Sequence, residues 1–428
     1  MFRWLILFML ISPATGIWLL EHGAYSVTFR KEGGPNGAFL PFVIYAVTVF
    51  VIYTLIRRRP LSRAYRRQMD HFYFIPTRQF SEQAGMSLLI AVFFLLLLLF
   101  GAGGIGVLTN SVGKGEFRTQ LGNLGAILYL GLKWVVPTLF AYVAFLYQRT
   151  SRTISTHAIM FSMTMVTLLF GASWGFKSGA IGMVMPALIL LFQRPTLKFV
   201  VLIVSATFIS LIGFALLFDT SVTNSGAAAF QLNVLEFVWE RVTTIQGDTP
   251  WGLWNLYVSG YQFPDYAPTL WATLGDSFLR SVMGVQQSNF TEWMHYHIDI
   301  IMTYLTGADP AEIVGGHSVT GTPFSEGLIA GGMMGVVFFA VVGGVMAGFL
   351  ERMLLKATIT MRPISAVTIS TYAFMFIMWL NSGSFVQLIH IASIFGLLLC
   401  YGTLKAISSI KFSNQSVLSP PSPLVAAE

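Results

Sequence analysis

The most constraining feature of this sequence is a succession of apolar runs, each close to the length that crosses a lipid bilayer. A transmembrane helix needs about 20 consecutive, mostly apolar residues. Ten segments show this pattern, and the sixth is short enough that we expect its end to tilt or to lie within protein. The segments are 2–20, 38–56, 86–106, 124–147, 156–174, 180–193, 199–218, 326–350, 363–380 and 384–404. The sequence therefore predicts an all-α polytopic integral membrane protein with about ten transmembrane helices.

The amino-acid composition supports the same class. Of the 428 residues only 10% are charged and 55% are hydrophobic, whereas a soluble domain has about 25% charged residues. The net charge of +7 is spread over short loops between the apolar runs, which argues against a nucleic-acid partner. The single cysteine, Cys400, lies in an apolar run, so no disulfide framework is expected within the chain. No small-residue cleavage site follows Leu20, so we expect the first run to be an uncleaved span rather than a signal peptide.

The distribution of lysine and arginine predicts the orientation in the membrane. Basic residues in short loops concentrate on the cytoplasmic side. Across the expected spans, seventeen basic residues fall on one side and seven on the other, and Lys133 is left within a span, to pair with an acidic neighbour or to snorkel. The loop 57–85 carries seven of the seventeen and is expected to touch anionic lipid headgroups. Both termini are thus predicted to be cytoplasmic, with segment 219–325 on the other side.

Segment 219–325 is a long interruption without an apolar run. It holds eleven of the eighteen acidic residues if Glu326 is counted, two basic residues, Arg241 and Arg280, and many tryptophans and tyrosines. Structureless loops beyond about 15 residues are uncommon and usually functional, so we predict a folded cap, with the chemistry where it meets the membrane helices. The chain then divides into a membrane bundle (1–218), this large loop between spans seven and eight (219–325), C-terminal membrane helices (326–404) and a disordered tail (405–428).

Apolar residues at helical spacing predict amphipathic helices within the large loop. The expected helices are 229–246, a helix from Asp276 that includes Arg280, and 291–306. Gly247, Asp248, Thr249 and Pro250 are expected to stop the first helix, and 251–275 to be irregular. Two later glycine groups, at 331–335 and 343–344, predict close helix packing.

Three basic residues on the outer side are candidates for binding an anionic group. Lys177 lies in a very short turn between two spans, where it either snorkels or helps to hold a lipid-linked anion. Arg241 and Arg280 stand in an acidic, aromatic-rich loop, and a guanidinium presents a planar fork that matches phosphate oxygens. The alternative is a structural ion pair with a nearby carboxylate, such as Asp276 four residues before Arg280.

Two residues are candidates for moving a proton. His317 lies in a glycine-rich turn ahead of a span, where it is either a proton acceptor near neutral pH or a surface histidine. Glu326 begins that span. It is an alternative proton acceptor, a residue that orients His317, or only a charge that suits the first turn of a helix. His390 is interpreted as a packing residue within a span. The pattern His295, His297, Asp299 would suit a metal on a strand, but the region is predicted to be helical, where positions i and i+2 do not share a face.

Four short stretches carry a resemblance to a known family. They are SWGFKSGAIGMVMPALIL (173–190), WERVTTIQG (239–247), GDSFLRSVMG (275–284) and GHSVTGTPFSEGLIAGGMMG (316–335). Together with ten or so spans and one large outer loop late in the chain, they resemble the O-antigen polymerases of the Wzy type, the oligosaccharide repeat unit polymerases. The resemblance covers most of the chain as topology. One departure is Lys177, where the family commonly has arginine.

The resemblance implies a GT-C-like fold in the bacterial inner membrane, with the large loop in the periplasm. It implies transfer of a growing glycan from undecaprenyl pyrophosphate to the sugar hydroxyl of a new lipid-linked repeat unit, in O-antigen or a related surface polysaccharide. No cofactor and no metal is implied, and the expected partners are lipid-linked glycans, membrane lipids and a chain-length regulator protein. On this basis His317 and Glu326 are expected to be catalytic. Arg241, Arg280 and Lys177 are expected to bind the pyrophosphate.

Two other functions compete with this hypothesis. The related O-antigen ligases carry a histidine to which His317 could correspond, and they use the lipid A core as acceptor. A lipid or polysaccharide transporter is the alternative outside enzymes. Transporters of this kind show repeated halves and broken helices at the middle of the membrane, and neither is clear in this sequence.

Overall fold

The computed structural model describes residues 2–57, 75–108, 117, 121, 124–174, 179–192, 239–240, 243–285, 289–314, 317–319, 321–360 and 362–409. Eight helical segments in this part of the chain are long and apolar enough to cross a membrane. The chain is mostly helical, so the predicted class of an all-α protein with several membrane-spanning helices is confirmed. The predicted span 199–218 lies outside the described residues.

Most predicted spans reappear with shifted ends. The spanning segments are α1 (Phe2–Glu21), α2 (Phe39–Ile56), α4 (Thr77–Leu96) with the π-helical turn η1 (Leu97–Gly101), α7 (Leu124–Leu130) with the π-helical turn η2 (Gly131–Val135) and α8 (Val136–Tyr147), α9 (Ile154–Ser173), α19 (Pro323–Ile359), α20 (Pro363–Ser382) and α22 (Ile391–Ser409). A shorter apolar helix, α10 (Gly179–Leu191), packs against α8, α9 and α20.

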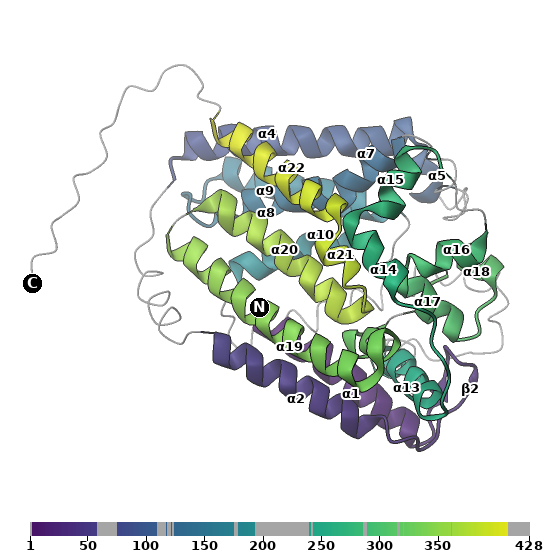
Figure 1. Cartoon of the computed structure of the whole chain (residues 1–428). Helices are drawn as coiled ribbons and strands as arrows, with labels where there is room; N and C mark the ends of the chain where they lie inside the picture. The colour runs from purple at the N-terminus through teal and green to yellow at the C-terminus, as the bar shows by residue number, and fades with distance from the viewer. Residues whose placement is uncertain are drawn as a thin grey trace, which may run out of the picture.

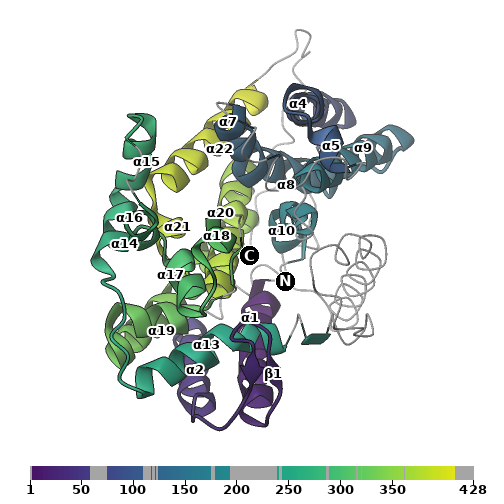
Figure 2. The same cartoon turned by 90° about the vertical axis from the view of Figure 1, so that its right-hand side faces the viewer.

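The helices between residues 243 and 314 gather at one end of the long helices, on the right-hand side of Figure 1. They are α13 (Thr244–Val258), α14 (Ala267–Trp271) with the 3₁₀ turn η5 (Ala272–Leu274), α15 (Asp276–Val282), α16 (Phe290–His295), α17 (Ile298–Leu305) and α18 (Pro310–Val314). Figure 2 views the molecule from this end, with α13 below and α14 to α16 beside α21 (Val386–Ile389) and α22. The helices α13 to α18 therefore form a layer across one end of the bundle.

The short hairpin between α1 and α2 belongs to the same end. Its strands, β1 (Tyr25–Ser26) and β2 (Lys31–Glu32), pair antiparallel. The backbone N–H of Thr28 donates to Oδ2 of Asp248 on α13 at 3.0 Å, and the indole of Trp254 donates to the carbonyl of Asn36 at 3.0 Å. These bonds attach α13 to the turn that joins the first two spans.

The helix α13 corrects one expectation. Residues Gly247 to Pro250 do not stop a helix but lie inside α13. The reason is tertiary packing, because α13 crosses α1 at backbone contact. A Cβ on Gly247 would lie 2.3 Å from the backbone nitrogen of Ile17, and one on Gly16 would lie 2.2 Å from the carbonyl oxygen of Thr243. Segment 251–275 is irregular only from 259 to 266, and residues 229–238 of the expected earlier helix lie outside the described residues.

Two expected helices are broken in the structure, each at a histidine. The expected helix 291–306 is two helices, α16 and α17, separated at His297, which is extended with φ −134° and ψ 103°. The expected span 384–404 is divided into α21 and α22 at His390, with φ −59° and ψ 142°. The helix expected from Asp276 is confirmed as α15 and contains Arg280.

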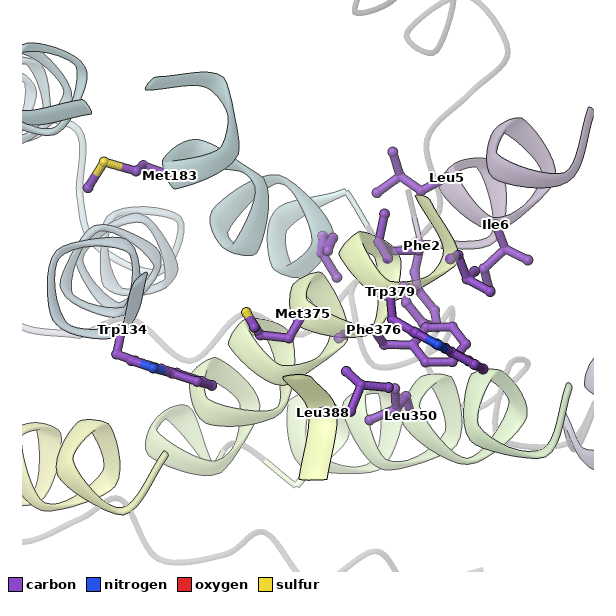
Figure 3. Packing of buried hydrophobic residues seen from close by; sticks show 14 of the residues in the cluster. Phe2, Leu5, Ile6, Trp134, Met183, Leu350, Met375, Phe376, Trp379 and Leu388 are labelled. Atoms are coloured by element: carbon purple, nitrogen blue, oxygen red, sulfur yellow. The ribbon is translucent and has the colours of Figure 1, made fainter. Parts of the chain in front are cut away.

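Small residues and aromatic rings hold the long helices together. A Cβ on Gly344 or Gly348 of α19 would lie 2.7 Å from Ile52 or Ile56 of α2, so these glycines permit the close packing predicted for 343–344. Figure 3 shows Phe376 and Trp379 of α20 beside Phe2 of α1. The ring centroids of Phe2 and Phe376 are 6.1 Å apart, and those of Phe376 and Trp379 are 5.5 Å apart. This cluster fixes α20, whose Trp379 donates a hydrogen bond to Glu326.

The helix α19 is interrupted near its start. Gly331 and Gly332 depart from helical geometry, and Gly332 has φ 57°, a conformation that favours glycine. The segment before the break begins with a cap, in which the Thr322 hydroxyl accepts from the backbone N–H of Ser325 at 3.3 Å. Gly331 and Gly332 therefore give a break, and Gly335 permits a close approach, because a Cβ on it would lie 2.2 Å from the carbonyl oxygen of Gly327. Glu326 lies on the short helical piece ahead of that break.

Candidate functional site

A cavity of about 1080 Å³ lies where the layer of short helices meets the long ones. Its walls come from α7 and η2, from α15 and α16, and from α21 and the start of α22. Among the described residues, five basic or acidic side chains line it: Lys133, Arg280, His297, Asp299 and His390. Six aromatic side chains line it as well: Tyr129, Trp134, Phe278, Phe290, Trp293 and Tyr296. The cavity therefore combines cations, proton-transfer groups and flat apolar faces.

Lys133 brings a positive charge into a segment that otherwise suits a membrane. It lies on the π-helical turn η2, and its Nζ is 5.8 Å from the ring centroid of Tyr129. Lys133 forms no ion pair with any acidic side chain in the part of the chain that the structure describes. An ionisable residue in a membrane segment is costly and marks function by default, and π-helical turns are frequent at functional sites. The structure thus points to Lys133, which sequence analysis left without a role.

Arg280 lies on the cavity wall but is already paired. Its Nε is 3.1 Å from Oδ2 of Asp276, and Nη1 is 3.0 Å from Oε1 of Glu292. Its guanidinium carbon lies 5.4 Å from the ring centroid of Tyr296. The ion pair with Asp276 that was the structural alternative is therefore present, together with a second one. An anion approaching Arg280 has to compete with two carboxylates.

His390 acts as the N-cap of α22. Its Nδ1 accepts from the backbone N–H of Ala392 at 3.0 Å, the position at which an N-cap side chain satisfies a free helical donor. An accepting Nδ1 carries no proton, so the neutral ring bears its hydrogen on Nε2. Burial lowers the pKa of His390, and the charge of Lys133 lowers it further, as does that of His297 when it is protonated. The interpretation of His390 as a packing residue missed this because the hydrogen bond leaves no trace in the apolar pattern.

His297 occupies the break between α16 and α17, half-buried against Trp293 at 5.8 Å between ring centroids. Within the described residues its ring makes no hydrogen bond, although its carbonyl accepts from Ile300 and Ile301 at 3.0 Å. Burial lowers the pKa of His297, while the charge of Asp299 acts in the opposite direction. The ring is therefore a neutral group at neutral pH, next to a carboxylate and open to the cavity.

Glu326 is fully buried and accepts hydrogen bonds from three different elements. The Tyr266 hydroxyl donates to Oε1 at 2.7 Å, and the Trp379 indole donates to Oε2 at 3.0 Å. The backbone N–H of Phe385 donates to both oxygens at 3.0 and 3.1 Å. Burial and the charge of Glu326 raise the pKa of Tyr266, which keeps this phenol protonated as a donor. These contacts make Glu326 a junction between α19, α20 and the start of α14.

His317 and Glu326, the other predicted site residues that the structure describes, do not line the cavity. His317 is exposed, its backbone N–H donates to the Glu312 carbonyl at 2.9 Å, and neither it nor Glu326 is among the described lining residues. Lys177 and Arg241 lie outside the described residues. Of the three predicted site residues that the structure describes, Arg280 is the one that lies on the cavity wall.

The pattern His295, His297, Asp299 forms no candidate metal site. No group of three metal-ligating side chains close enough to hold an ion is present among the described residues. The break at His297 separates the two histidines, so His295 ends α16 while His297 precedes α17.

The fold and the cavity together define a mostly helical protein with several apolar helices long enough to span a membrane, and with a polar, aromatic-walled cavity at one end of them. Comparison of the chain with models of protein families, with curated proteins and with solved structures found no match. Any more specific function is therefore argued from the cavity and from the sequence pattern.

Proposed function

We propose that this protein is a glycosyltransferase that polymerises lipid-linked oligosaccharide repeat units. The observation that carries the proposal is the cavity at the end of a bundle of apolar helices, which combines aromatic walls with Lys133, a cation that has no acidic partner among the described residues. A substrate with a polyprenyl chain, a pyrophosphate and sugar rings needs an apolar, a cationic and an aromatic environment side by side. Ligand pockets commonly measure about 300–1000 Å³, so a volume of about 1080 Å³ accommodates an oligosaccharide.

The leaving group of this reaction is a lipid pyrophosphate, on which negative charge develops. Fixed positive charges aimed at such a group in a site that excludes water are among the largest contributions to catalysis. Lys133 supplies one such charge from η2, and Arg280 also lines the cavity, with its two carboxylate partners. Lys177 and Arg241 stay predicted contributors from the sequence.

The acceptor is a sugar hydroxyl, whose proton must be removed as the new bond forms. His317 and Glu326 stay sequence-based predictions for this role. Both oxygens of Glu326 are occupied by donors from Tyr266, Trp379 and Phe385, which supports a positioning role for it. The aromatic walls offer apolar faces to sugar rings.

The proposal includes a location. The excess of basic residues on one side supports a bacterial inner-membrane protein with cytoplasmic termini and the cavity end in the periplasm. On that side polyprenyl-linked repeat units, membrane lipids and a chain-length regulator protein would meet the protein. No cofactor, metal or nucleic acid enters the proposed reaction.

The experiment that tests this function is the glycan ladder of a deletion strain. Loss of long chains with one repeat unit retained on lipid A supports the polymerase. Loss of all repeat units from lipid A supports an O-antigen ligase instead, and accumulation of lipid-linked repeats on the cytoplasmic face supports a transporter. Complementation with wild-type protein must restore the ladder. An unchanged ladder and unchanged capsule and exopolysaccharide would contradict the proposed function.

A further inference from the structure

We infer that His297 is the cavity group that accepts the proton of the attacking sugar hydroxyl, and that His390 donates a hydrogen bond from Nε2. This inference rests on the proposed function and assigns roles within the same cavity. Both side chains line it, and they come from segments far apart in the sequence. His317, the acceptor predicted from the sequence, is exposed and is not among the described lining residues, so the cavity favours His297 over it.

The position of His297 suits a proton acceptor. The backbone is extended at His297, which is the N-cap residue of α17. The start of α17 therefore fixes the position from which the ring projects. The Trp293 ring packs against the imidazole at a tilt, and the ring nitrogens of His297 form no hydrogen bond with any other described residue. A base must reach its substrate within hydrogen-bonding distance, and an unbonded ring in a cavity wall satisfies that condition. Asp299 nearby stabilises the imidazolium once it has formed.

The position of His390 excludes the same role. Its Nδ1 is occupied by the Ala392 N–H at 3.0 Å, and its Nε2 already carries the hydrogen of the neutral ring. Lys133 nearby disfavours a second proton on the ring. His390 therefore presents a donor to the cavity, suited to an oxygen of the pyrophosphate. The two histidines differ in role because one caps a helix with its side chain and the other does not.

The proposed step balances. The acceptor hydroxyl oxygen forms a bond to the anomeric carbon of the donor glycan. The bond from that carbon to the pyrophosphate oxygen breaks, and its electron pair stays on the polyprenyl pyrophosphate. The hydroxyl proton moves to a ring nitrogen of His297, which becomes an imidazolium. That proton passes to water after product release, and the ring returns to its neutral form.

The pH dependence follows from the neutral form being active. Protonation of His297 in the free enzyme removes the acceptor, so kcat/KM falls as the pH drops through its pKa. Burial lowers that pKa, so the acid limb lies below the usual histidine value of about 6.5. The described charged and titratable groups on the surrounding elements are Asp276, Arg280, Glu292, His295, Tyr296, Asp299, Tyr304, Glu312, Tyr129, Lys133, His390 and Glu326.

The test is a pH profile of the purified protein in lipid nanodiscs, with polyprenyl-pyrophosphate-linked repeat units extracted from the deletion strain. For His297→Gln we expect kcat/KM at neutral pH to fall about 100-fold or more, and the acid limb to disappear. His297→Asn is a second variant, because asparagine is favoured at helix N-caps and preserves α17. His390→Asn keeps an oxygen for the Ala392 N–H while removing the cavity donor. We expect it to lower kcat and retain the acid limb.

The matched control is His22→Gln. His22 is exposed outside the cavity, with Nδ1 2.7 Å from the Trp18 carbonyl oxygen, and we expect wild-type rate and profile. An acid limb that persists in both His297 variants, or that disappears in His317→Gln or Asp299→Asn instead, would overturn the inference and leave the polymerase standing. Wild-type protein that forms no polymer from the extracted lipid would overturn both.

Discussion

The hydrogen bonds to Glu326 allow a quantitative prediction about how the cavity end is held together. A hydrogen bond to a charged group contributes about 1.5–3 kcal/mol, and a neutral one about 0.5–1.5 kcal/mol. Tyr266→Phe removes the 2.7 Å bond to the carboxylate, so we expect the free energy of unfolding to fall by about 2 kcal/mol. In a Glu326→Gln background the same change removes a neutral bond and should cost about 1 kcal/mol. The predicted coupling energy between the two residues is therefore about 1 kcal/mol.

The assay is a double-mutant cycle by steric trapping in bicelles, with the free energy of unfolding measured for all four proteins. Tyr45→Phe is the control, because the Tyr45 hydroxyl is buried on α2 without a partner in the described residues. Its removal should cost nothing or stabilise the protein. Glu326→Ala should cost at least about 3 kcal/mol, since three donors then lose their acceptor.

Two outcomes would refute this account of Glu326. A coupling energy near zero would mean that Tyr266 and Glu326 do not interact. Complete loss of polymerisation in a stably folded Glu326→Gln protein, with an acid limb removed at the same time, would mean that the carboxylate itself transfers the proton. A positioning role predicts reduced but measurable activity, because glutamine still accepts one of the hydrogen bonds.

Two further predictions concern α13. In a detergent-solubility assay, Gly247→Leu should prevent accumulation of folded protein, because its Cβ would lie 2.3 Å from the α1 backbone. The control Gly34→Ala should fold normally in this assay, because nothing lies within 4 Å of a Cβ at Gly34. Burial raises the pKa of Asp248, so its contribution to stability is present at low pH and decreases as pH rises through that pKa. Asp248→Asn should remove this dependence in unfolding measured from about pH 4 to 7; an unchanged dependence would contradict it.

The sequence predicts the long helices well because the bilayer leaves few alternatives. An apolar run of about 20 residues in a membrane has to satisfy its backbone internally, so helix follows from composition. The ion pair between Arg280 and Asp276 could also be predicted from the sequence, because residues four apart share a helix face. Short-range rules thus account for the class of fold and for one member of the candidate site.

The sequence does not predict the contacts that depend on distant residues. The three donors to Glu326 lie 60, 53 and 59 positions away, so a first-turn charge and a buried junction look alike in sequence. The stop expected at Gly247 to Pro250 fails because packing against α1 overrides the local preference. The break at His390 depends on a side-chain bond to Ala392 within an otherwise apolar run. The sequence does indicate Lys133, because a charge inside an apolar span is costly and usually functional.

The measurement that tests the central claim most directly is polymer formation by purified Lys133 variants with extracted lipid-linked repeat units. If Lys133 stabilises the departing pyrophosphate, Lys133→Met should lower kcat about 100- to 1000-fold, and Lys133→Arg should retain part of the rate. Lys31→Met is the matched control, since the Lys31 Nζ lies 5.2 Å from the Trp251 ring outside the cavity, and it should polymerise normally. Wild-type polymerisation by a folded Lys133→Met protein would contradict the claim that this cavity is the active site.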